Sequence, residues 1–335
     1  MTTLLEVNEL KKHFAVRGGV LGRQVASVQA VDGVSFDVER GETLGIVGES
    51  GCGKSTTARL LMRLIEPDDG SIRLGGLHVA PGELSLREMR RRMQMVFQDS
   101  YASLNPRLTI ESSITFGPKV HGVSDSEAKR RARDLLGRVG LDPNLFIRRY
   151  PHELSGGQRQ RVNIARALAL EPELLLLDEA VSALDKSVEA QVLNLLQALK
   201  RDFDLTYIFI SHDLNVVHYM SDRVLVMYLG KVVEIGPVEA IYGRAAHPYT
   251  RALLSAMPSM DPGKRATEAP ITGDPPNPID PPSGCRFHTR CPHAEPVCSK
   301  LAPKLVRLAD HGHQAACHME DPASGHSAAT QKVAA

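Results

Sequence analysis

A glycine-rich loop near the amino terminus limits the possible folds more than any other stretch of the chain. Its nine residues are Gly48-Glu49-Ser50-Gly51-Cys52-Gly53-Lys54-Ser55-Thr56. The loop follows an apolar run at 43–47 and precedes an apolar-periodic stretch at 58–62, which predicts strand, loop and helix in that order. Its glycines let successive backbone N–H groups point at one centre, as in an anion site at a helix N-terminus. We expect Lys54 to reach the β- and γ-phosphates of a nucleoside triphosphate and Ser55 to hold Mg²⁺.

The size and composition of the chain narrow its class. With 335 residues it exceeds one core of ordinary size, so we expect one large domain with an appendage. A net charge of +1 gives no bulk field for nucleic acid, and the lack of Trp argues against a base-stacking platform. No stretch approaches the roughly 20 apolar residues that cross a bilayer, and the first residues lack a secretory signal. We therefore expect a cytosolic chain that reaches a membrane only through a partner.

The first 47 residues read as short strands. Apolar or alternating runs occur at 4–7, 28–31 and 34–38, and the glycines at 18, 19 and 22 mark a turn between them. Phe14 is a candidate for stacking on a nucleotide base, with a core aromatic of an edge strand as the alternative.

Two polar features follow the next strand and the next helix. Gln98 ends the apolar run 93–97 and could bind Mg²⁺ or position water, although a single Gln there is commonly a solvated strand end. Residues 108–149 read as helical with charged, solvated faces. Leu154-Ser155-Gly156-Gly157-Gln158 then starts another helix, with Ser155 as its N-cap and bare N–H groups at the glycines. This second phosphate-binding helix start could face the same nucleotide as Lys54, complete a site across a dimer, or be a plain capped helix.

Acidic and imidazole side chains come directly after two buried strands. The run 174–177 is wholly apolar, which indicates a central parallel strand, and it ends in Asp178 and Glu179. We expect Asp178 to meet Mg²⁺ and Glu179 to polarise the attacking water. His212 follows the apolar run 206–210 and could contact the γ-phosphate or orient Glu179. The runs 224–228 and 231–234 predict a hairpin.

Four cysteines are concentrated near the carboxyl terminus, after a proline-rich stretch at 258–283 that predicts a stiff linker. They are Cys285, Cys291, Cys298 and Cys317. Four thiolates suit a [4Fe–4S] cluster or a structural Zn²⁺ site, and the spacings lack the C-x2-C pairs of common zinc sites, which favours the cluster. Neighbouring histidines keep a mixed zinc site open, and unrelated free cysteines are the remaining alternative. We expect residues 321–335 to be disordered.

Together these motifs resemble those of the ATP-binding subunits of ABC transporters over roughly residues 1–320. The phosphate loop, Gln98, the 154–158 signature, Asp178-Glu179, Asp185 and His212 stand in the order and spacing of that family. Within it the chain is most similar to subunits of dipeptide and oligopeptide importers. That similarity rests on the stretches 30–36, 98–99, 103–107, 247–254 and 284–298.

The resemblance implies an α/β P-loop NTPase fold. Its core would be a mixed, largely parallel sheet with helices on both faces, with an antiparallel β subdomain and a helical signature subdomain. The implied domains are an ABC ATPase domain at 1–257 (helical part about 100–165), the linker, a Cys-rich extension at 284–320 and the tail.

The resemblance also implies roles for individual residues. ATP would lie between the phosphate loop of one subunit and the signature of another in a head-to-tail dimer. Glu179 would be the catalytic base, His212 the switch that holds it, and Gln98 the sensor of the γ-phosphate. Mg²⁺ would be held by Ser55, Gln98 and Asp178. The nucleotide contacts would be Phe14, Gly48, Glu49, Ser50, Gly51, Cys52, Gly53, Lys54, Ser55, Thr56, Ser155, Gly156, Gly157, Gln158 and Asp185.

The implied partners are two transmembrane permease subunits, an extracytoplasmic substrate-binding protein, and a second homologous ATPase or a second copy, without nucleic acid. The chain would lie at the cytoplasmic face of the inner membrane, held by the permease subunits. Its tail cysteines would hold the [4Fe–4S] cluster that some members carry. One departure is Ala180, where the family usually has Pro; it removes no catalytic group, so we expect hydrolysis to survive. The transported substrate is not encoded in this chain.

Two other classes of function remain as alternatives. A soluble ABC ATPase of DNA repair or translation usually carries long coiled-coil inserts or two cassettes, and this sequence has neither. A metal-sensing regulator with a secondary ATPase is disfavoured by the presence of both Glu179 and His212.

Overall fold

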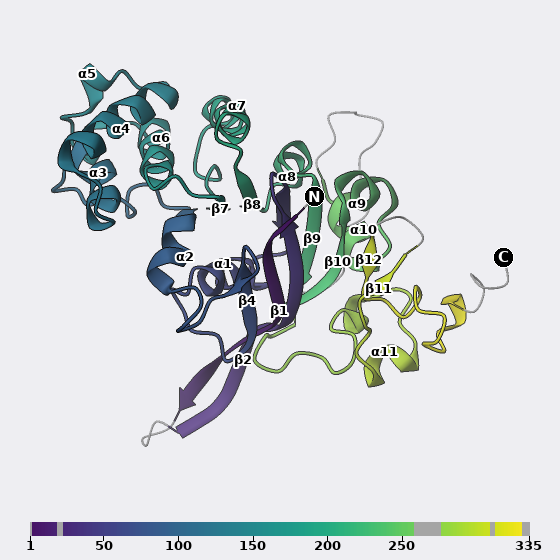
Figure 1. Cartoon of the computed structure of the whole chain (residues 1–335). Coiled ribbons are helices and arrows are strands. Elements are labelled where there is room, and N and C mark those ends of the chain that lie inside the picture. The colour runs from purple at the N-terminus through teal and green to yellow at the C-terminus, as the bar shows by residue number, and fades with distance from the viewer. Residues whose placement is uncertain (1, 19–22, 258–275, 309–311, 330–335) are drawn as a thin grey trace.

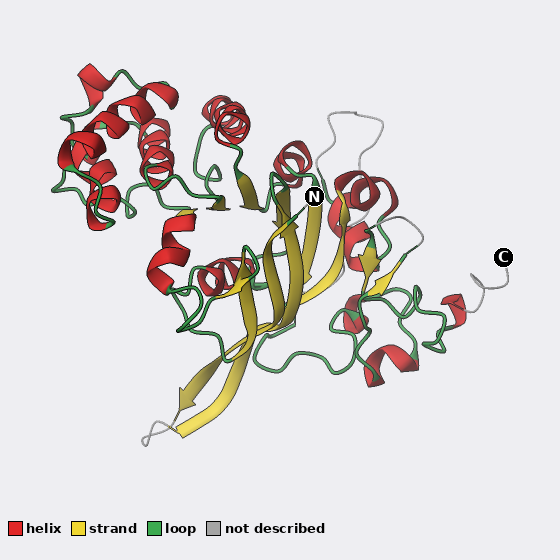
Figure 2. Cartoon of the chain, in the orientation of Figure 1, coloured by secondary structure: helices red, strands yellow, loops and turns green. Residues whose placement is uncertain are grey.

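The computed structural model describes residues 2–18, 23–257, 276–308 and 312–329. Figures 1 and 2 show a strand-rich body, a separate group of helices at its upper left and a small carboxyl-terminal unit at its right. None of the helices in these ranges is both long enough and apolar enough to cross a membrane.

The larger sheet runs through the body in the order β11-β12-β10-β9-β3-β8-β7-β6. The strands β9, β3, β8, β7 and β6 are parallel, and β10, β12 and β11 extend the sheet with antiparallel pairs. The bounds of its strands are β3 Thr43–Val47, β6 Met93–Val96, β7 Leu174–Asp178, β8 Thr206–Ile210, β9 Arg223–Tyr228, β10 Lys231–Pro237, β11 Val306–Arg307 and β12 Gln314–Ala315.

The central strands are buried on both faces, as the sequence predicts for parallel strands. In β7, Leu175 and Leu177 pack into one hydrophobic core, while Leu174 and Leu176 pack into a second core on the other face. The α/β fold with helices over both faces of a mixed sheet is therefore confirmed. The helices around this sheet are α1 Lys54–Leu61, α2 Leu86–Arg92, α7 Lys186–Phe203, α8 Leu214–Met220, α9 Val238–Arg244 and α10 Pro248–Ser255.

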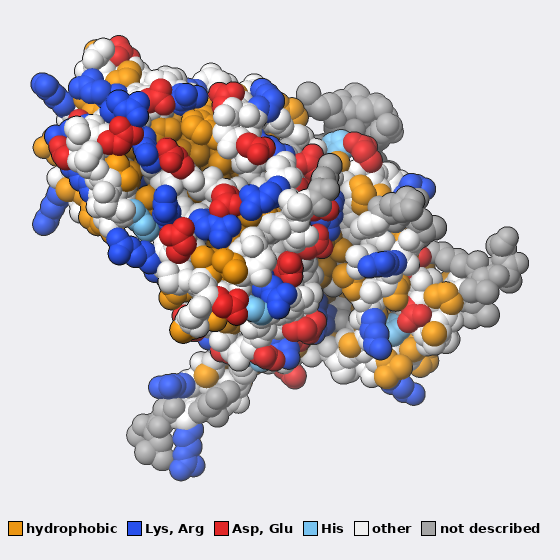
Figure 3. Space-filling model, viewed as in Figure 1, with side chains coloured by type: hydrophobic (Ala, Val, Ile, Leu, Met, Phe, Trp, Pro, Cys, Tyr) orange, Lys and Arg blue, Asp and Glu red, His pale blue; other side chains and the backbone are white. Residues whose placement is uncertain are grey.

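A second, antiparallel sheet has the order β2-β1-β4-β5. Its strands are β1 Thr3–Gly18, β2 Arg23–Glu39, β4 Asp69–Leu74 and β5 Leu77–His78. The prediction of several short strands here is wrong, because β1 and β2 pair as one long ribbon whose register shifts absorb the breaks in alternation. The end of this ribbon projects from the body in Figure 1, and Figure 3 shows basic side chains on it. Gly18 ends β1, and the other turn glycines lie outside the described residues.

The separate helical group forms from well-capped segments. It contains α3 Ile110–Val120, α4 Asp125–Arg138, α5 Pro143–Phe146 and α6 Gly156–Leu168. The side chains of Thr109, Ser124 and Ser155 each accept the backbone N–H three residues ahead, at the starts of α3, α4 and α6. The helices predicted between 108 and 170 are thus present.

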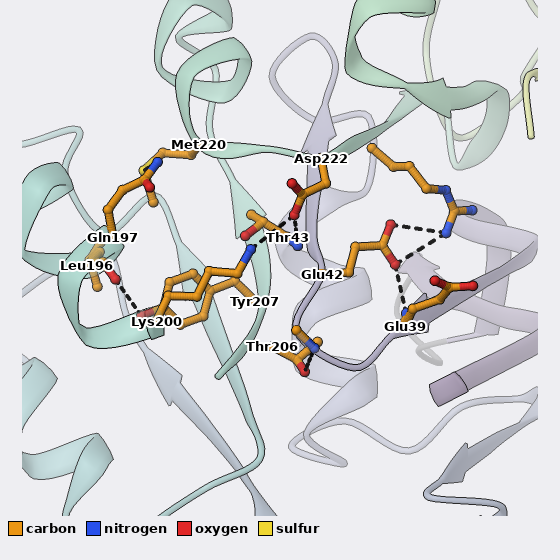
Figure 4. A network of polar contacts seen from close by, with 12 residues as sticks. Glu39, Glu42, Thr43, Leu196, Gln197, Lys200, Thr206, Tyr207, Met220 and Asp222 are labelled. Atoms are coloured by element: carbon orange, nitrogen blue, oxygen red, sulfur yellow. Dashed lines mark hydrogen bonds and ion pairs between the residues drawn. The ribbon is translucent and has the colours of Figure 1, made fainter. Parts of the chain in front are cut away.

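Polar contacts fix the amino-terminal edge of the larger sheet (Figure 4). The Asp222 carboxylate accepts the Thr43 N–H at 2.7 Å and the Lys200 ammonium at 3.0 Å. Glu42 binds Arg223 at 3.1 Å. These contacts hold the starts of β3 and β9 together, at the end of β3 opposite the phosphate loop.

The carboxyl-terminal unit adds to the larger sheet through β12, where Ala315 pairs with Glu234 of β10. It also contains the helix α11 Pro296–Lys300. The buried carboxylate of Glu234 binds the ring of His313 at 2.8 Å and fixes this unit against the body. The part of the proline-rich linker at 258–275 lies outside the described residues.

The predicted disorder from 321 onward is wrong for 321–329. His326 is buried there, and its ring hydrogen-bonds the carbonyl of His293 at 3.0 Å. Ser327 contacts the Glu295 carboxylate with both its hydroxyl and its N–H. A segment of small and polar residues predicts disorder, but these side-chain contacts stabilise its ordered conformation.

Candidate functional site

The phosphate loop lies between β3 and α1 and depends on its glycines. Gly48 and Gly53 have φ angles of 150° and 110°. A Cβ atom at Gly48 would lie 2.2 Å from the Met227 carbonyl oxygen, and one at Gly53 would lie 2.3 Å from that of Ala30. The loop therefore requires glycine at both positions, and it leads into the start of α1, where backbone N–H groups are suited to bind an anion.

The side chain of Lys54 lies against the phosphate loop. Its buried ammonium donates to the carbonyl oxygens of Gly48 at 2.7 Å and Glu49 at 3.1 Å. The loop therefore holds the lysine at the position from which a point charge neutralises phosphate oxygens.

A hydroxyl and a carboxylate meet beside the loop. Ser55 Oγ donates to Asp178 Oδ1 at 3.0 Å. Burial raises the pKa of Asp178, and the nearby Glu179 charge adds to this effect, while the Ser55 hydrogen bond opposes it. These hard oxygen donors fit Mg²⁺, which prefers such ligands and would favour the ionised carboxylate.

Glu179 is held from two neighbouring strands. Gln98, after β6, donates its amide N–H to Glu179 Oε2 at 2.8 Å. His212, after β8, has Nδ1 3.5 Å from the same oxygen. Glu179 itself follows β7, has φ 49°, and donates its N–H to the Ile210 carbonyl at 2.9 Å. The left-handed backbone of a non-glycine residue is strained, and such strain is concentrated at functional sites.

One cavity of about 380 Å³ joins these features. This volume is within the usual range for small-molecule sites. The lining residues are Val28, Ala30, Ser50, Gly51, Gly53, Lys54, Ser55, Thr56, Gln98, Glu179 and His212. The carboxyl ends of parallel strands thus bring an anion-binding loop, a carboxylate and its neighbours Gln98 and His212 to one space.

Other predicted contacts do not line this cavity. Phe14 is partly exposed on β1, where it pairs with the cavity residue Val28 of β2. Ser155 and Gln158 are engaged in a capping box, in which Ser155 Oγ accepts the Gln158 N–H at 3.3 Å and Gln158 Oε1 accepts the Ser155 N–H at 3.0 Å. Asp185 is the N-cap of α7. Within one chain, the two phosphate-binding helix starts do not share a cavity.

The four carboxyl-terminal cysteines all line a second, much smaller cavity of about 10 Å³. In the described part of the chain, however, no group of three or more His, Cys, Asp or Glu side chains is arranged as a metal site. Burial raises the pKa of Cys285 to about 11 and that of Cys317 to about 12, so both thiols are protonated at neutral pH.

Comparison with known proteins follows the same division of the chain. Residues 31–182 match the family model described as ABC transporter, and residues 233–298 match the model described as oligopeptide/dipeptide transporter, C-terminal region. The chain is 50% identical over 324 residues to the oligopeptide transport ATP-binding protein AppF of Bacillus subtilis, covering 95% of this chain and 97% of that one. It belongs to the ATP-binding subunits of ABC transporters.

Other relatives agree. A probable peptide ABC transporter ATP-binding protein of Sinorhizobium fredii is 51% identical, covering 96% of this chain and 91% of that one. The oligopeptide transport ATP-binding protein OppF of Escherichia coli is 50% identical, covering 95% and 97%. This ABC subunit is therefore in the oligopeptide/dipeptide transporter branch of the family, as its motifs predict, and it is an ATP-hydrolysing transport component.

Solved structures resemble this ABC subunit in fold. The structure of cbiO1 from Clostridium perfringens, part of the transporter complex cbiONQ, has a TM-score of 0.62 at 27% identity and covers 73% of this chain and 92% of that one. A dimeric ATP-binding cassette in a post-hydrolysis state with ADP and Pi has a TM-score of 0.60 at 26% identity, covering 70% and 99%.

Sequence reasoning does not identify Tyr249 and Arg290 as neighbours of the phosphate loop. The Glu49 N–H donates to the Tyr249 hydroxyl at 2.8 Å, and the Glu49 carboxylate accepts from Arg290 at 3.0 Å. These partners are 200 and 241 residues away in the chain. No local pattern in the sequence links such distant positions.

Proposed function

We propose that this subunit energises the import of dipeptides, oligopeptides or related small solutes. The match of residues 233–298 to the transporter C-terminal region and the printed names of the relatives support a peptide-type substrate. The observation that carries the proposal is the cavity in which Lys54, Glu179 and His212 converge.

In this proposal the chain positions ATP and polarises water. The loop N–H groups and Lys54 bind the phosphates, and Ser55, Gln98 and Asp178 would hold Mg²⁺, which would offset phosphate charge when bound. Glu179 accepts the proton of the attacking water, while Gln98 and His212 orient its carboxylate through the contacts at 2.8 and 3.5 Å. Catalysis is by placement and electrostatics, without a covalent intermediate on the protein.

We propose that a second ATPase completes the site. Ser155 caps α6 outside the cavity, so we assign the start of this helix, at Gly156 and Gly157, to a nucleotide held by another chain. Phe14 and Asp185 do not line the cavity of their own chain. We propose that they contact a nucleotide only in the assembled dimer. The second chain is either a homologous ATPase or a second copy.

The transport role requires membrane partners. We propose two permease subunits that hold this chain at the cytoplasmic face of the membrane, with an extracytoplasmic protein that delivers the solute. Charges of both signs are interspersed on the face shown in Figure 3, which supports protein partners rather than nucleic acid.

For the carboxyl-terminal unit we propose a [4Fe–4S] cluster, with Zn²⁺ as the alternative. The proposal rests on ligand type: four thiols line one small cavity, although the described side chains are not gathered there as a metal site. Cys285, Cys291, Cys298 and Cys317 would hold it as thiolates, and metal binding would release their protons. The bound group would stabilise the fold of this small unit by joining its four cysteines.

Uptake by the assembled transporter tests the function. The complex, purified through a tag on this chain, is placed in lipid vesicles with ATP trapped inside, on the side of this subunit. The extracytoplasmic protein that delivers the solute is added outside. We expect ATP-dependent accumulation of labelled di- and oligopeptides and its loss in the Glu179→Gln complex. ATP hydrolysis without accumulation of any member of a broad peptide mixture would contradict the peptide assignment.

A further inference from the structure

The carboxyl-terminal unit reaches the phosphate loop through an arginine. Arg290 ends the 3₁₀ turn His288–Arg290, directly before Cys291. Its Nη1 donates to both carboxylate oxygens of Glu49, at 3.0 and 3.3 Å, and lies 3.3 Å from the Tyr228 hydroxyl. The Arg290 side chain is 7% exposed and that of Glu49 22%, so water screens this pair weakly.

Glu49 connects this contact to the site. It is the second residue of the loop, its N–H donates to the Tyr249 hydroxyl, and its carbonyl accepts from Lys54 at 3.1 Å. A shift of Glu49 would therefore move a carbonyl oxygen that accepts a hydrogen bond from Lys54, the lysine that we assign to phosphate binding. Without Arg290, the Glu49 carboxylate would also leave a partly buried, unpaired negative charge on the loop that we assign to the triphosphate.

A second arginine of the same unit supports the other side of the loop. Arg286 donates to the carbonyl of Leu229 and to Asp32, at 2.6 Å in the latter case. The next residue, Gly230, donates its N–H to the Cys52 carbonyl of the loop at 2.8 Å. The two arginines, four residues apart, thus support two points of the loop, Glu49 directly and Cys52 through the Leu229-Gly230 turn.

We propose that Arg290 is a positioning residue for ATP binding, which neutralises Glu49 and fixes the phosphate loop from the carboxyl-terminal unit. The unit then has a role in nucleotide affinity besides any role in assembly. This role rests on the ion pair and the loop contacts and needs no metal in the cysteine cavity.

Nucleotide titration of the full-length chain tests the proposal. Binding of ATP without magnesium is measured by calorimetry for the parent, Arg290→Met and the control Arg307→Met, an exposed arginine of the same unit. We expect Arg290→Met to weaken ATP binding by at least about tenfold, as for truncation of one partner of a buried charge pair, and Arg307→Met to leave it unchanged. An ATP Kd within about twofold of the parent in folded Arg290→Met would overturn the proposal.

A double-variant cycle separates positioning from mere anchoring of the unit. If Arg290 acts through Glu49, Arg290→Met has little further effect on ATP binding in a Glu49→Gln background, because no charge is left to neutralise. In the assembled transporter, Arg290→Met should raise KM for ATP and leave kcat near the parent value. An undiminished loss in the Glu49→Gln background would show that Arg290 only anchors the unit.

Should Arg290→Met fail to fold, Arg290→Gln takes its place, since it keeps hydrogen-bond donors but loses the charge. We expect several-fold weaker ATP binding by Arg290→Gln, and no such loss in the Glu49→Gln background. Equal ATP binding by Arg290→Gln and the parent would overturn the proposal.

Discussion

The amide of Gln98 donates a 2.8 Å hydrogen bond to the same Glu179 oxygen that His212 approaches at 3.5 Å. Gln98 follows β6 and His212 follows β8, so the carboxylate is held from the strands on both sides of its own. In the proposed mechanism this arrangement separates two roles: Glu179 would accept the proton of the reacting water, and its two neighbours would fix the direction of its carboxylate. The predictions below use that separation.

Glu179→Gln should abolish turnover without weakening ATP binding. The amide is isosteric and is still able to contact Gln98 and His212, but it does not accept the proton of water. We expect phosphate release by the assembled transporter to fall by at least about 100-fold, the scale of a lost general base. Phosphate release and retained ATP are measured together. The assigned role fails if the variant hydrolyses ATP as fast as the parent.

His212→Ala should lower kcat with little change in KM for ATP. The ring contacts Glu179 rather than the phosphate loop, so its loss frees the carboxylate direction and leaves nucleotide binding intact. We expect a loss of about 100-fold in kcat, the scale of a misplacement near the reacting atoms. His121→Ala, at the end of α3, is the matched control. A raised KM with kcat preserved would assign His212 to ATP binding instead.

Gly156→Ala should separate binding in one chain from hydrolysis in the assembled pair. A Cβ at Gly156 would lie 3.8 Å from Leu184, an ordinary contact, so the fold should tolerate it. The added methyl would lie at the helix start that we assign to the partner's nucleotide. We expect unchanged ATP binding by the isolated chain and at least about tenfold slower hydrolysis in the transporter.

Gly137→Ala is the control for that variant, because its Cβ would meet nothing within 4 Å in the helical group. It should leave both measurements unchanged. Equal hydrolysis by Gly156→Ala and Gly137→Ala would argue against a signature that acts across a dimer.

The proposed cluster predicts that the purified chain contains metal and that Cys291 is needed to hold it. Full-length chain, purified without oxygen or chelator, should carry about four iron atoms with sulfide, or one Zn²⁺ in the alternative. Cys291→Ser should lose this metal, whereas Cys52→Ser should keep it, since Cys52 lies in the phosphate loop. Elemental analysis and absorbance spectra distinguish the two metals. Parent protein without either metal would refute the cofactor proposal.

Much of the site could be predicted because its signals are local. Each of its three signals is contained in a stretch of fewer than a dozen residues. The signals are the loop at 48–56, the apolar run before Asp178 and Glu179, and His212 after a buried strand. Parallel strands then bring their carboxyl ends to one edge of the sheet, so topology converts local patterns into a common cavity.

Other features depend on contacts between distant segments. The Glu49–Arg290 pair joins residues 241 positions apart, and a sequence with 40 basic and 39 acidic side chains offers many equally plausible pairs. The single ribbon of β1 and β2 depends on register shifts that interrupt the alternation of apolar residues. The order of residues 321–329 depends on where His293 and Glu295 lie in space.

Purification of the complex through a tag on this chain, from its native membrane, tests the central assignment most directly. Co-purifying proteins are identified, and ATP hydrolysis is measured for the parent and Glu179→Gln complexes. We predict two permease subunits, an ATPase partner or second copy, and hydrolysis that Glu179→Gln removes. Recovery of the chain alone or with nucleic acid, or hydrolysis that survives Glu179→Gln, would contradict it.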